Sequence, residues 1–408
     1  MSEWKKVKLG EIAITIQTGP FGSQLHQSDY SEFGTPVVMP KDIVNGKIDV
    51  STIARVESYH IERLSRYKIT EGDILYARRG DVGKCVYIED YQEGWLCGTG
   101  CLRVKIDITK ALPKFVFFQL QKKEIIGWIE KHAIGATMLN LNTSILSNVP
   151  IDLPPIETQN RIATILSRYD SLIENYQKQI KLLEESAQRL YKEWFIDFRF
   201  SGHENTKIVD GIPEGWKELK ITDNQFFRPA QCRIIPFEGI KNYYATADVN
   251  GTYICSSGVV VGYDDKPSRA QIQPSQHSVW FARMSNSYKI IGFTRTNEER
   301  RKSLILSSGF AGFESAYECF SYMYCLVSST WFDEQKNRYA TGATQVSLTN
   351  EGLSRIKVVF PTQKLVKEFS LKINPIIDNV FLLRECCFEL VEARNRLLLK
   401  LMNGEIEV

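Results

Sequence analysis

The sequence predicts an α+β fold in which two mostly β globular regions alternate with two long coiled-coil helices, as an internal pseudo-two-fold repeat. The first observation behind this prediction is a run of apolar residues in steps of four and three between Ile162 and Trp194, the seam of a long coiled-coil helix. The second is that adding 207 to each number yields a matching seam from Phe369 to Leu401, in which Arg394 is the single charged member. Since 207 is close to half of 408 residues, each half of the chain is expected to hold one globular region and one helix.

The first globular region is expected to be built from short strands. Turn signals such as Asn45-Gly46 separate runs of four to seven residues, which include expected strands at residues 74–77 and 84–88. One amphipathic helix is expected around residues 113–132. The predicted order is first globular region, first long helix, linker, second globular region and second long helix, at residues 1–150, 151–200, 201–215, 216–360 and 361–408.

Composition sets limits on the class of protein. The charged and apolar fractions, 24% and 43%, are those of a soluble globular protein. No run approaches the roughly 18 apolar residues that span a bilayer, and the first residues lack the apolar segment of a signal peptide, so a cytoplasmic protein without a membrane partner is expected. Nine cysteines, an odd number, favour free thiols. A net charge of +3 neither demands nor excludes a nucleic-acid partner.

Short segments repeat in the same order in both halves. Trp4 at the start of the chain is echoed by Trp216. Three pairs of segments match at shifts of 205, 206 and 207, namely residues 72–78 with 277–283, 42–46 with 248–252, and 135–137 with 342–344. Shared anchors with divergent residues between them are typical of a duplicated scaffold whose loops have different functions.

This order of parts resembles the specificity subunit of type I restriction-modification systems. The likeness is carried by the Trp4-Lys5 opening, by residues 72–78, and by residues 135–159 leading into the heptads, and it covers essentially the whole chain. The resemblance implies two target-recognition domains, each reading one half of a split DNA sequence, held apart by the two helices as an antiparallel coiled coil. It also implies two methyltransferase subunits that dock on these helices, and restriction subunits. No cofactor is then expected in this chain, whereas S-adenosylmethionine, ATP and Mg²⁺ are expected in the partner subunits.

Physical reasoning supplies a mechanism for the same function. Two recognition modules on a stiff spacer meet one face of a DNA duplex only at defined separations, since one turn of DNA is roughly 34 Å. A split target with a fixed gap follows. The divergence between the modules indicates two different half-sites and an asymmetric target.

Ten polar residues are candidates for DNA contacts. Arginine can pair with guanine, and arginine or lysine can hold phosphates; solvated surface charge is the alternative for each basic residue. Asparagine, glutamine and serine can read adenine or bond phosphate, and turn capping is an equally good alternative. Arg78 and Arg283 rank above the other basic residues because they occupy matched positions. The candidates are Ser23, Gln24, Arg78, Arg79, Lys84, Asn140, Asn142, Arg283, Lys289 and Arg295.

The end of the first long helix is a candidate docking surface. Tyr191, Trp194, Phe195 and Phe198 bring together more large apolar surface than a two-helix pair readily covers. Large exposed apolar patches usually mark interfaces, so these four residues are expected to help dock another subunit. The alternative is packing within this chain alone.

No catalytic site is expected. The signature of amino-methyltransferases is an acidic or amide residue followed by two prolines and an aromatic residue. The nearest segment here is Asp152-Leu153-Pro154-Pro155-Ile156, which departs from it because Leu153 intervenes and no aromatic residue follows. No glycine-rich loop fits S-adenosylmethionine or a nucleoside phosphate, and histidines and cysteines lack the spacing of a metal site. The sequence thus favours a non-catalytic DNA-recognition subunit. The alternatives are a coiled-coil scaffold whose globular ends bind proteins and, less favoured, a free-standing methyltransferase.

Overall fold

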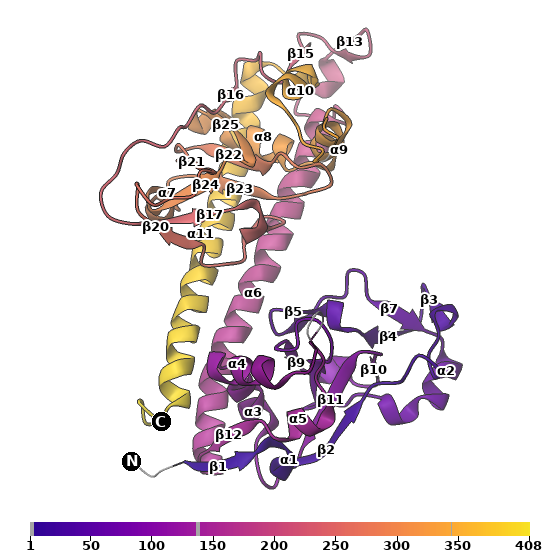
Figure 1. Cartoon of the computed structure of the whole chain (residues 1–408). Coiled ribbons are helices and arrows are strands. Elements are labelled where there is room, and N and C mark those ends of the chain that lie inside the picture. Colours follow the sequence, from indigo (N-terminus) through magenta and orange to yellow (C-terminus); the bar gives the residue numbers. More distant parts are fainter. Residues whose placement is uncertain (1–3, 136–138, 344) are drawn as a thin grey trace. The chain divides into compact units, whose positions relative to one another are not determined.

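The computed structural model describes residues 4–135, 139–343 and 345–408 (Figure 1). The chain forms two compact units: unit 1 consists of Met1–Ser171 with Val391–Val408, and unit 2 of Leu172–Leu390. Each unit therefore contains one globular module and parts of both long helices. Of the matched segments 135–137 and 342–344, residues Ala136, Thr137 and Thr344 lie outside the described residues.

Unit 1 is built on two four-stranded sheets and two strand pairs. The first sheet has the order β2-β11-β8-β9 and the second β10-β4-β7-β3. Strand β1 pairs antiparallel with β12, and β5 forms a hairpin with β6. Asn45 and Gly46, the predicted turn, both have positive φ, 50° and 76°, as a tight hairpin requires. The strands are β1 Lys5–Lys8, β2 Ala13–Thr18, β3 Tyr30–Ser31, β4 Thr35–Val38, β5 Ile43–Val44, β6 Lys47–Ile48, β7 Ala54–Val56, β8 Ile74–Ala77, β9 Cys85–Tyr87, β10 Leu96–Cys97, β11 Cys101–Ile106 and β12 Pro150–Leu153.

The helix expected at residues 113–132 is two helices. Gln121 closes α3, and Lys122 has extended backbone angles before α4 begins. The side chain of Lys122 is buried and forms an ion pair with Asp152 at 3.5 Å, which the break in the helix makes possible. The helices of this module are α1 Leu9–Ile12, α2 Ser58–Arg63, α3 Pro113–Leu120, α4 Lys123–His132 and α5 Thr143–Ser147, with 3₁₀ turns at Gln27–Asp29, Pro40–Asp42, Ser65–Tyr67 and Asp90–Gln92.

Unit 2 repeats the strand order of the first sheet of unit 1, and its second sheet differs at one edge strand. Its first four-stranded sheet has the order β16-β25-β22-β23 and its second β20-β17-β24-β21, while β15 pairs with β26. Helix α8 packs on β22 and β25. The strands are β13 Ile208–Val209, β14 Ile212–Pro213, β15 Lys217–Lys220, β16 Phe227–Pro229, β17 Lys241–Tyr244, β18 Val249–Asn250, β19 Tyr253–Ile254, β20 Val259–Val261, β21 Ala270–Ile272, β22 Ser278–Ala282, β23 Ile290–Phe293, β24 Leu304–Ser307, β25 Phe310–Ser315 and β26 Lys357–Phe360; the helices are α7 Glu298–Ser303, α8 Tyr317–Val327, α9 Thr330–Arg338 and α10 Asn350–Arg355, with 3₁₀ turns at His203–Asn205 and Thr246–Asp248.

The two long helices have the same length and the same place in the repeat. Helix α6 is Ile156–Phe195 and α11 is Gln363–Met402, 40 residues each, so both ends differ by 207 positions. Pro154 and Pro155 directly precede α6. Proline is tolerated there because the N–H group that it lacks would have no hydrogen-bond acceptor within the helix. Among the described residues, none of the helices combines the length and the apolar character that crossing a membrane requires.

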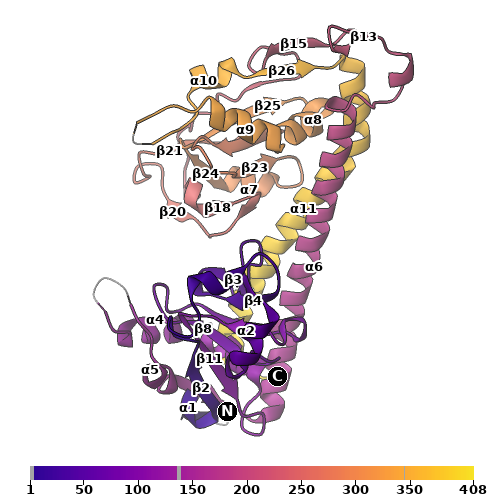
Figure 2. The same ribbon diagram turned by 90° about the vertical axis from the view of Figure 1, so that its right-hand side faces the viewer.

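Within each unit the two helices pack antiparallel. In unit 2, Ile180 packs with Val380 and Leu383, and the Cys387 sulfur faces the Ile173 carbonyl at 3.9 Å. Higher numbers on α6 thus meet lower numbers on α11, and the two ribbons lie side by side in this unit (Figures 1 and 2). In unit 1, Arg394 Nη1 donates to Asp170 Oδ1 at 2.6 Å. This ion pair accounts for the single charged residue in the second seam.

The interpretation of the end of α6 as an exposed patch is wrong. Tyr191, Trp194 and Phe195 are only 3%, 6% and 4% exposed. The Phe195 ring lies 5.0 Å from that of Phe369, and Trp194 lies 5.8 Å from the same ring. The reason is that the module of unit 2 covers this end of the helix pair with its own aromatic side chains.

Phe198, the fourth residue of the predicted docking patch, is partly buried and has a φ of 56°. Its ring lies edge-on to Trp216 at 5.3 Å. All four residues therefore belong to the core of unit 2 or pack against it. Which surface docks another subunit stays a prediction.

Candidate nucleic-acid interface

Three of the predicted DNA-binding residues meet at one edge of unit 1. The loop after β8 begins at Arg78, whose N–H donates to the Gly100 carbonyl at 2.7 Å and whose carbonyl accepts from Leu141 N at 2.8 Å. The next residue, Arg79, forms an antiparallel bridge with Asn140. The structure therefore brings Arg78, Arg79 and Asn140 together from segments about sixty positions apart.

A fourth residue of this edge was missed by sequence reasoning. Phe21 is 55% exposed, and the Arg78 guanidinium carbon lies 5.9 Å from the centre of its ring. Among the described residues, Arg78 Nε and Asn140 Oδ1 are buried atoms without a hydrogen-bond partner. Arg79 is exposed. We call Phe21, Arg78, Arg79 and Asn140 the unit 1 loop cluster. The signal in the sequence that could have pointed to Phe21 is its position directly after the turn residues Gly19 and Pro20.

The polar candidates near this cluster have structural roles. Gln24 Oε1 accepts from the Tyr67 hydroxyl at 2.7 Å and from Phe21 N at 3.2 Å. Asn142 caps helix α5, because its Oδ1 accepts from Ile145 N at 2.8 Å. Both side chains therefore make capping bonds of the kind that the alternative interpretation expects, and a contact of either with DNA stays a prediction.

The other two candidates in unit 1 are exposed. Ser23 lies in the same loop as Gln24. Lys84 lies before β9, where its Nζ is 3.2 Å from Asp81 Oδ2. This carboxylate partly offsets the positive charge of Lys84. A contribution of either residue to DNA binding stays a prediction.

Unit 2 repeats the backbone construction of the loop cluster. Arg283 N donates to the Gly309 carbonyl at 2.9 Å, and its carbonyl accepts from Leu348 N at 2.8 Å. The next residue, Met284, forms an antiparallel bridge with Ser347. Arg78 and Arg283 therefore occupy the same backbone position in the two modules, whereas Arg79 and Asn140 are replaced by Met284 and Ser347.

The side chain of Arg283 differs from that of Arg78 in what it binds. Its Nε donates to the Phe310 carbonyl at 3.2 Å, its Nη1 to the Leu348 carbonyl at 2.9 Å and its Nη2 to Asn350 Oδ1 at 2.9 Å. Burial lowers the pKa of Arg283. Because these bonds use three of the five N–H donors of a guanidinium, Arg283 holds the loop in place and keeps at most two donors for a base or phosphate.

We expect the substitution Arg283→Met to lower the free energy of unfolding by about 2 kcal/mol, because it leaves the Phe310 and Leu348 carbonyls without their donors. Urea unfolding of the full chain measures this. The matched control is Arg79→Ala at the exposed neighbouring position of the other module, where a change within about 0.5 kcal/mol is expected. Equal stability of both variants would contradict the structural role of Arg283.

The remaining basic candidates of unit 2 lie at two different ends of its first sheet. Lys289 is near Arg283, since its carbonyl accepts from Ala282 N, and its Nζ donates to the Thr246 carbonyl at 2.7 Å. Arg295 follows Phe293, which pairs with Ser278 at the opposite end of β22. Arg295 is therefore not brought together with Arg283.

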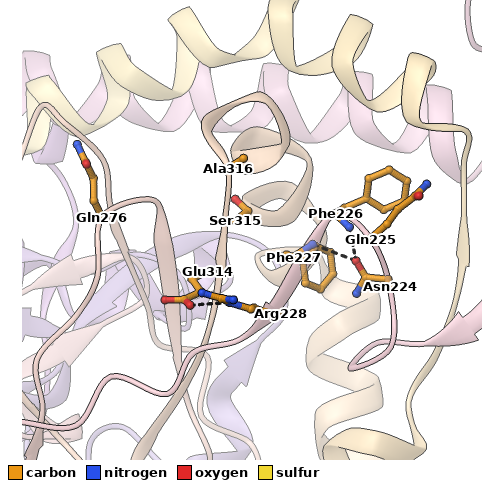
Figure 3. Close-up of a pocket in the computed structure, with 9 residues that line it drawn as sticks. All are labelled: Asn224, Gln225, Phe226, Phe227, Arg228, Gln276, Glu314, Ser315 and Ala316. Atoms are coloured by element: carbon orange, nitrogen blue, oxygen red, sulfur yellow. Dashed lines mark hydrogen bonds and ion pairs between the residues drawn. The ribbon is translucent and has the colours of Figure 1, made fainter.

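A hollow of about 470 Å³, whose lining residues Figure 3 shows, includes Glu314, and it therefore lies at the end of this sheet where Glu314 pairs with Ser278, away from the loop edge. In its lining, Arg228 Nε donates to Glu314 Oε1 at 2.8 Å. Asn224 Oδ1 accepts from the N–H groups of Phe226 and Phe227 beside it. Among the described residues that line this hollow, the one cation, Arg228, is already paired with a carboxylate, which makes the hollow a weaker candidate than the loop edge for binding a nucleic acid.

Comparison with known proteins finds one family model that matches the N-terminal part of the chain and relatives that match its whole length. Residues 1–185 match the family described as the type I restriction modification DNA specificity domain. A putative type I restriction enzyme MjaX specificity subunit of Methanocaldococcus jannaschii is 23% identical over 421 residues, covering 100% of this chain and 94% of that protein. The type I restriction enzyme MjaIX specificity subunit of the same organism is 26% identical over 422 residues, covering 99% and 93%.

A solved structure shares the fold. The crystal structure of the S subunit of the type I restriction-modification system from M. genitalium matches with a TM-score of 0.57 and 16% identity, over 98% of this chain and 96% of that one. Both modules and both helices are therefore included in the similarity.

Proposed function

We propose that this chain is a member of the family of type I restriction-modification specificity subunits, and that it selects a split and asymmetric DNA sequence for separate methyltransferase subunits. The observation that carries the proposal is the repeated loop construction, in which Arg78 and Arg283 occupy the same backbone position in two modules. Two copies of one scaffold are what the reading of two half-sites requires.

The unit 1 loop cluster has the groups that DNA recognition uses. Arg79 is exposed and can bond a phosphate or the O6 and N7 atoms of guanine. The exposed ring of Phe21 suits contact with a thymine methyl group. In unit 2 the positions matching Arg79 and Asn140 carry Met284 and Ser347. Because these side chains differ in charge and hydrogen bonding, the two half-sites are expected to differ in sequence.

The long helices support a spacer role. A helix of 40 residues is about 60 Å long, and two helices packed against each other resist bending. Modules attached to such a pair would read half-sites separated by a fixed gap. We propose that two methyltransferase subunits and the restriction subunits assemble on this chain and supply the catalysis, with S-adenosylmethionine, ATP and Mg²⁺ bound by those partners.

Mapping of methylated adenines tests the proposal. The chain is co-expressed with its methyltransferase subunits, and host DNA is sequenced for modified bases. Methylation confined to one split motif with a fixed gap is the expected result. A contiguous motif would mean that one module alone reads bases. Methylation that does not depend on this chain would favour the protein-binding scaffold instead.

Arg79→Ala is expected to lower the slope of log Kd against log salt concentration by about 0.9, because one phosphate contact fewer releases one counterion fewer. The measurement is DNA binding by the chain assembled with its methyltransferase subunits, across a series of salt concentrations. Lys217→Ala, at an exposed position of β15, is the control and is expected to leave the slope unchanged. An unchanged slope for Arg79→Ala would remove Arg79 from the DNA contact.

A further inference from the structure

A buried polar network joins the helix pair of unit 2 to its recognition module. Arg384 on α11 forms an ion pair with Glu184 on α6, and the two side chains are only 11% and 22% exposed. Tyr324 on α8 bonds both of them: its hydroxyl donates to Glu184 Oε1 at 3.0 Å and accepts from Arg384 Nη2 at 3.1 Å. Three helices therefore meet at these three side chains.

Further contacts extend the network to the sheet side of the module. The Arg384 guanidinium carbon lies 5.6 Å from the centre of the Tyr253 ring on β19 and 5.1 Å from that of Phe381. One turn further along α6, Gln188 Nε2 donates to the Cys325 carbonyl at 3.0 Å and to Ser328 Oγ at 2.8 Å. The module is thus attached to both helices by directional bonds as well as by apolar packing.

The network admits one register of the helices. Buried ion pairs generally add little net stability, since desolvation offsets the attraction, but breaking one is costly. A slip of α6 by one turn would place Ile180 or Gln188 where Glu184 now meets Arg384. Arg384 would then be buried without a counter-charge, at a cost in free energy. An apolar seam residue such as Leu183 carries no charge and therefore adds no such cost when the helix slips.

Unit 1 folds without this network. Adding 207 to Glu184 leads to Val391, and subtracting 207 from Tyr324 leads to Phe117; both lie in unit 1, and neither has a polar side chain. The repeated scaffold of module and helix pair therefore does not require these polar groups. Their presence in unit 2 alone points to a requirement specific to the second module.

We propose that Arg384 and Glu184 are positioning residues that fix the orientation of the second recognition module on the helix pair, and with it the gap at which the second half-site is read. This inference rests on the proposed function. The two side chains act through Tyr324 and the helix register, without touching DNA themselves. The gap between half-sites, rather than the half-site sequences, is the property they determine.

The test replaces the network by apolar groups of similar shape. The triple variant Arg384→Met, Glu184→Met, Tyr324→Phe removes the ion pair together with the hydroxyl that bonds both of its members, so none of these three groups is left as an unpaired buried partner. Methylation is mapped for the full chain co-expressed with its methyltransferase subunits. We expect the half-site sequences to be kept, and the ratio of methylation at the wild-type gap to that at gaps one base pair longer or shorter to fall roughly tenfold, the scale of losing one base contact.

A second variant and a control make the outcome decisive. Arg384→Lys keeps the charge but loses the planar fork of the guanidinium, and a smaller fall of the same ratio is expected. Lys364→Met, on the exposed face of the same helix, is expected to leave the ratio unchanged. The inference is overturned if the triple variant or Arg384→Lys folds and still methylates the wild-type gap and the neighbouring gaps in the wild-type ratio. If the wild-type chain itself directs no split motif, the proposed function fails, and this result is distinct from an unchanged ratio.

Discussion

Removal of one heptad from each long helix is expected to abolish methylation of the wild-type target and to shorten the gap by about three base pairs. Seven helical residues span about 10 Å, and base pairs follow each other at about 3.4 Å. Residues 168–174 and 388–394 are suited to deletion, because both apolar seams continue in phase across the cut. Asp170 and Arg394, which pair with each other, are removed together.

The measurement is again the map of methylated adenines. Arg396→Met is the control: it changes an exposed residue of α11 without changing the length of the helix, and the same target is expected to be methylated. A variant that lacks the heptads and still methylates the wild-type motif with its original gap would contradict the spacer role of the helices.

Trp194→Ala is expected to lower the free energy of unfolding by about 3–5 kcal/mol, the range for deleting a buried aromatic side chain. Trp194 is 6% exposed and packs against Phe369 within unit 2. Urea unfolding of the full chain measures the change. Leu371→Ala is the matched control on α11, because Leu371 is 79% exposed, and a change within about 0.5 kcal/mol is expected.

The same pair of variants tests the docking interpretation. A Trp194→Ala chain of wild-type stability that no longer assembles with methyltransferase subunits would restore the end of α6 as a docking surface. Loss of stability without the partners present would confirm that Trp194 belongs to the core of unit 2.

The regular parts of the fold were predictable because they depend on local order in the chain. The heptad spacing predicted long helices within residues 151–200 and 361–408, and the structure has Ile156–Phe195 and Gln363–Met402. The expected strand at residues 74–77 is β8, Ile74–Ala77. The break at Lys122 was not predictable, because the ion pair that accompanies it joins Lys122 to Asp152, thirty positions away.

The candidate site was predictable in its backbone and less so in its side chains. The matched segments 72–78 and 277–283 placed Arg78 and Arg283 at equivalent positions, as the hydrogen bonds of both loops show. The sequence did not reveal that Arg283 bonds two carbonyls and an asparagine, whereas Arg78 lies beside Phe21. Each of these partners comes from a segment distant in the chain.

The sequence by itself thus determined the repeat, the two helices and the positions of the matched loops, because periodicity and duplication are properties of linear order. Only the tertiary structure decided which of those residues are free to bind. Phe195 packs against Trp216 and Tyr322 of the module that follows it, and Arg384 meets Glu184 two hundred positions away. Burial and pairing depend on which segments the fold brings together, and the spacing of residues along the chain does not contain that information.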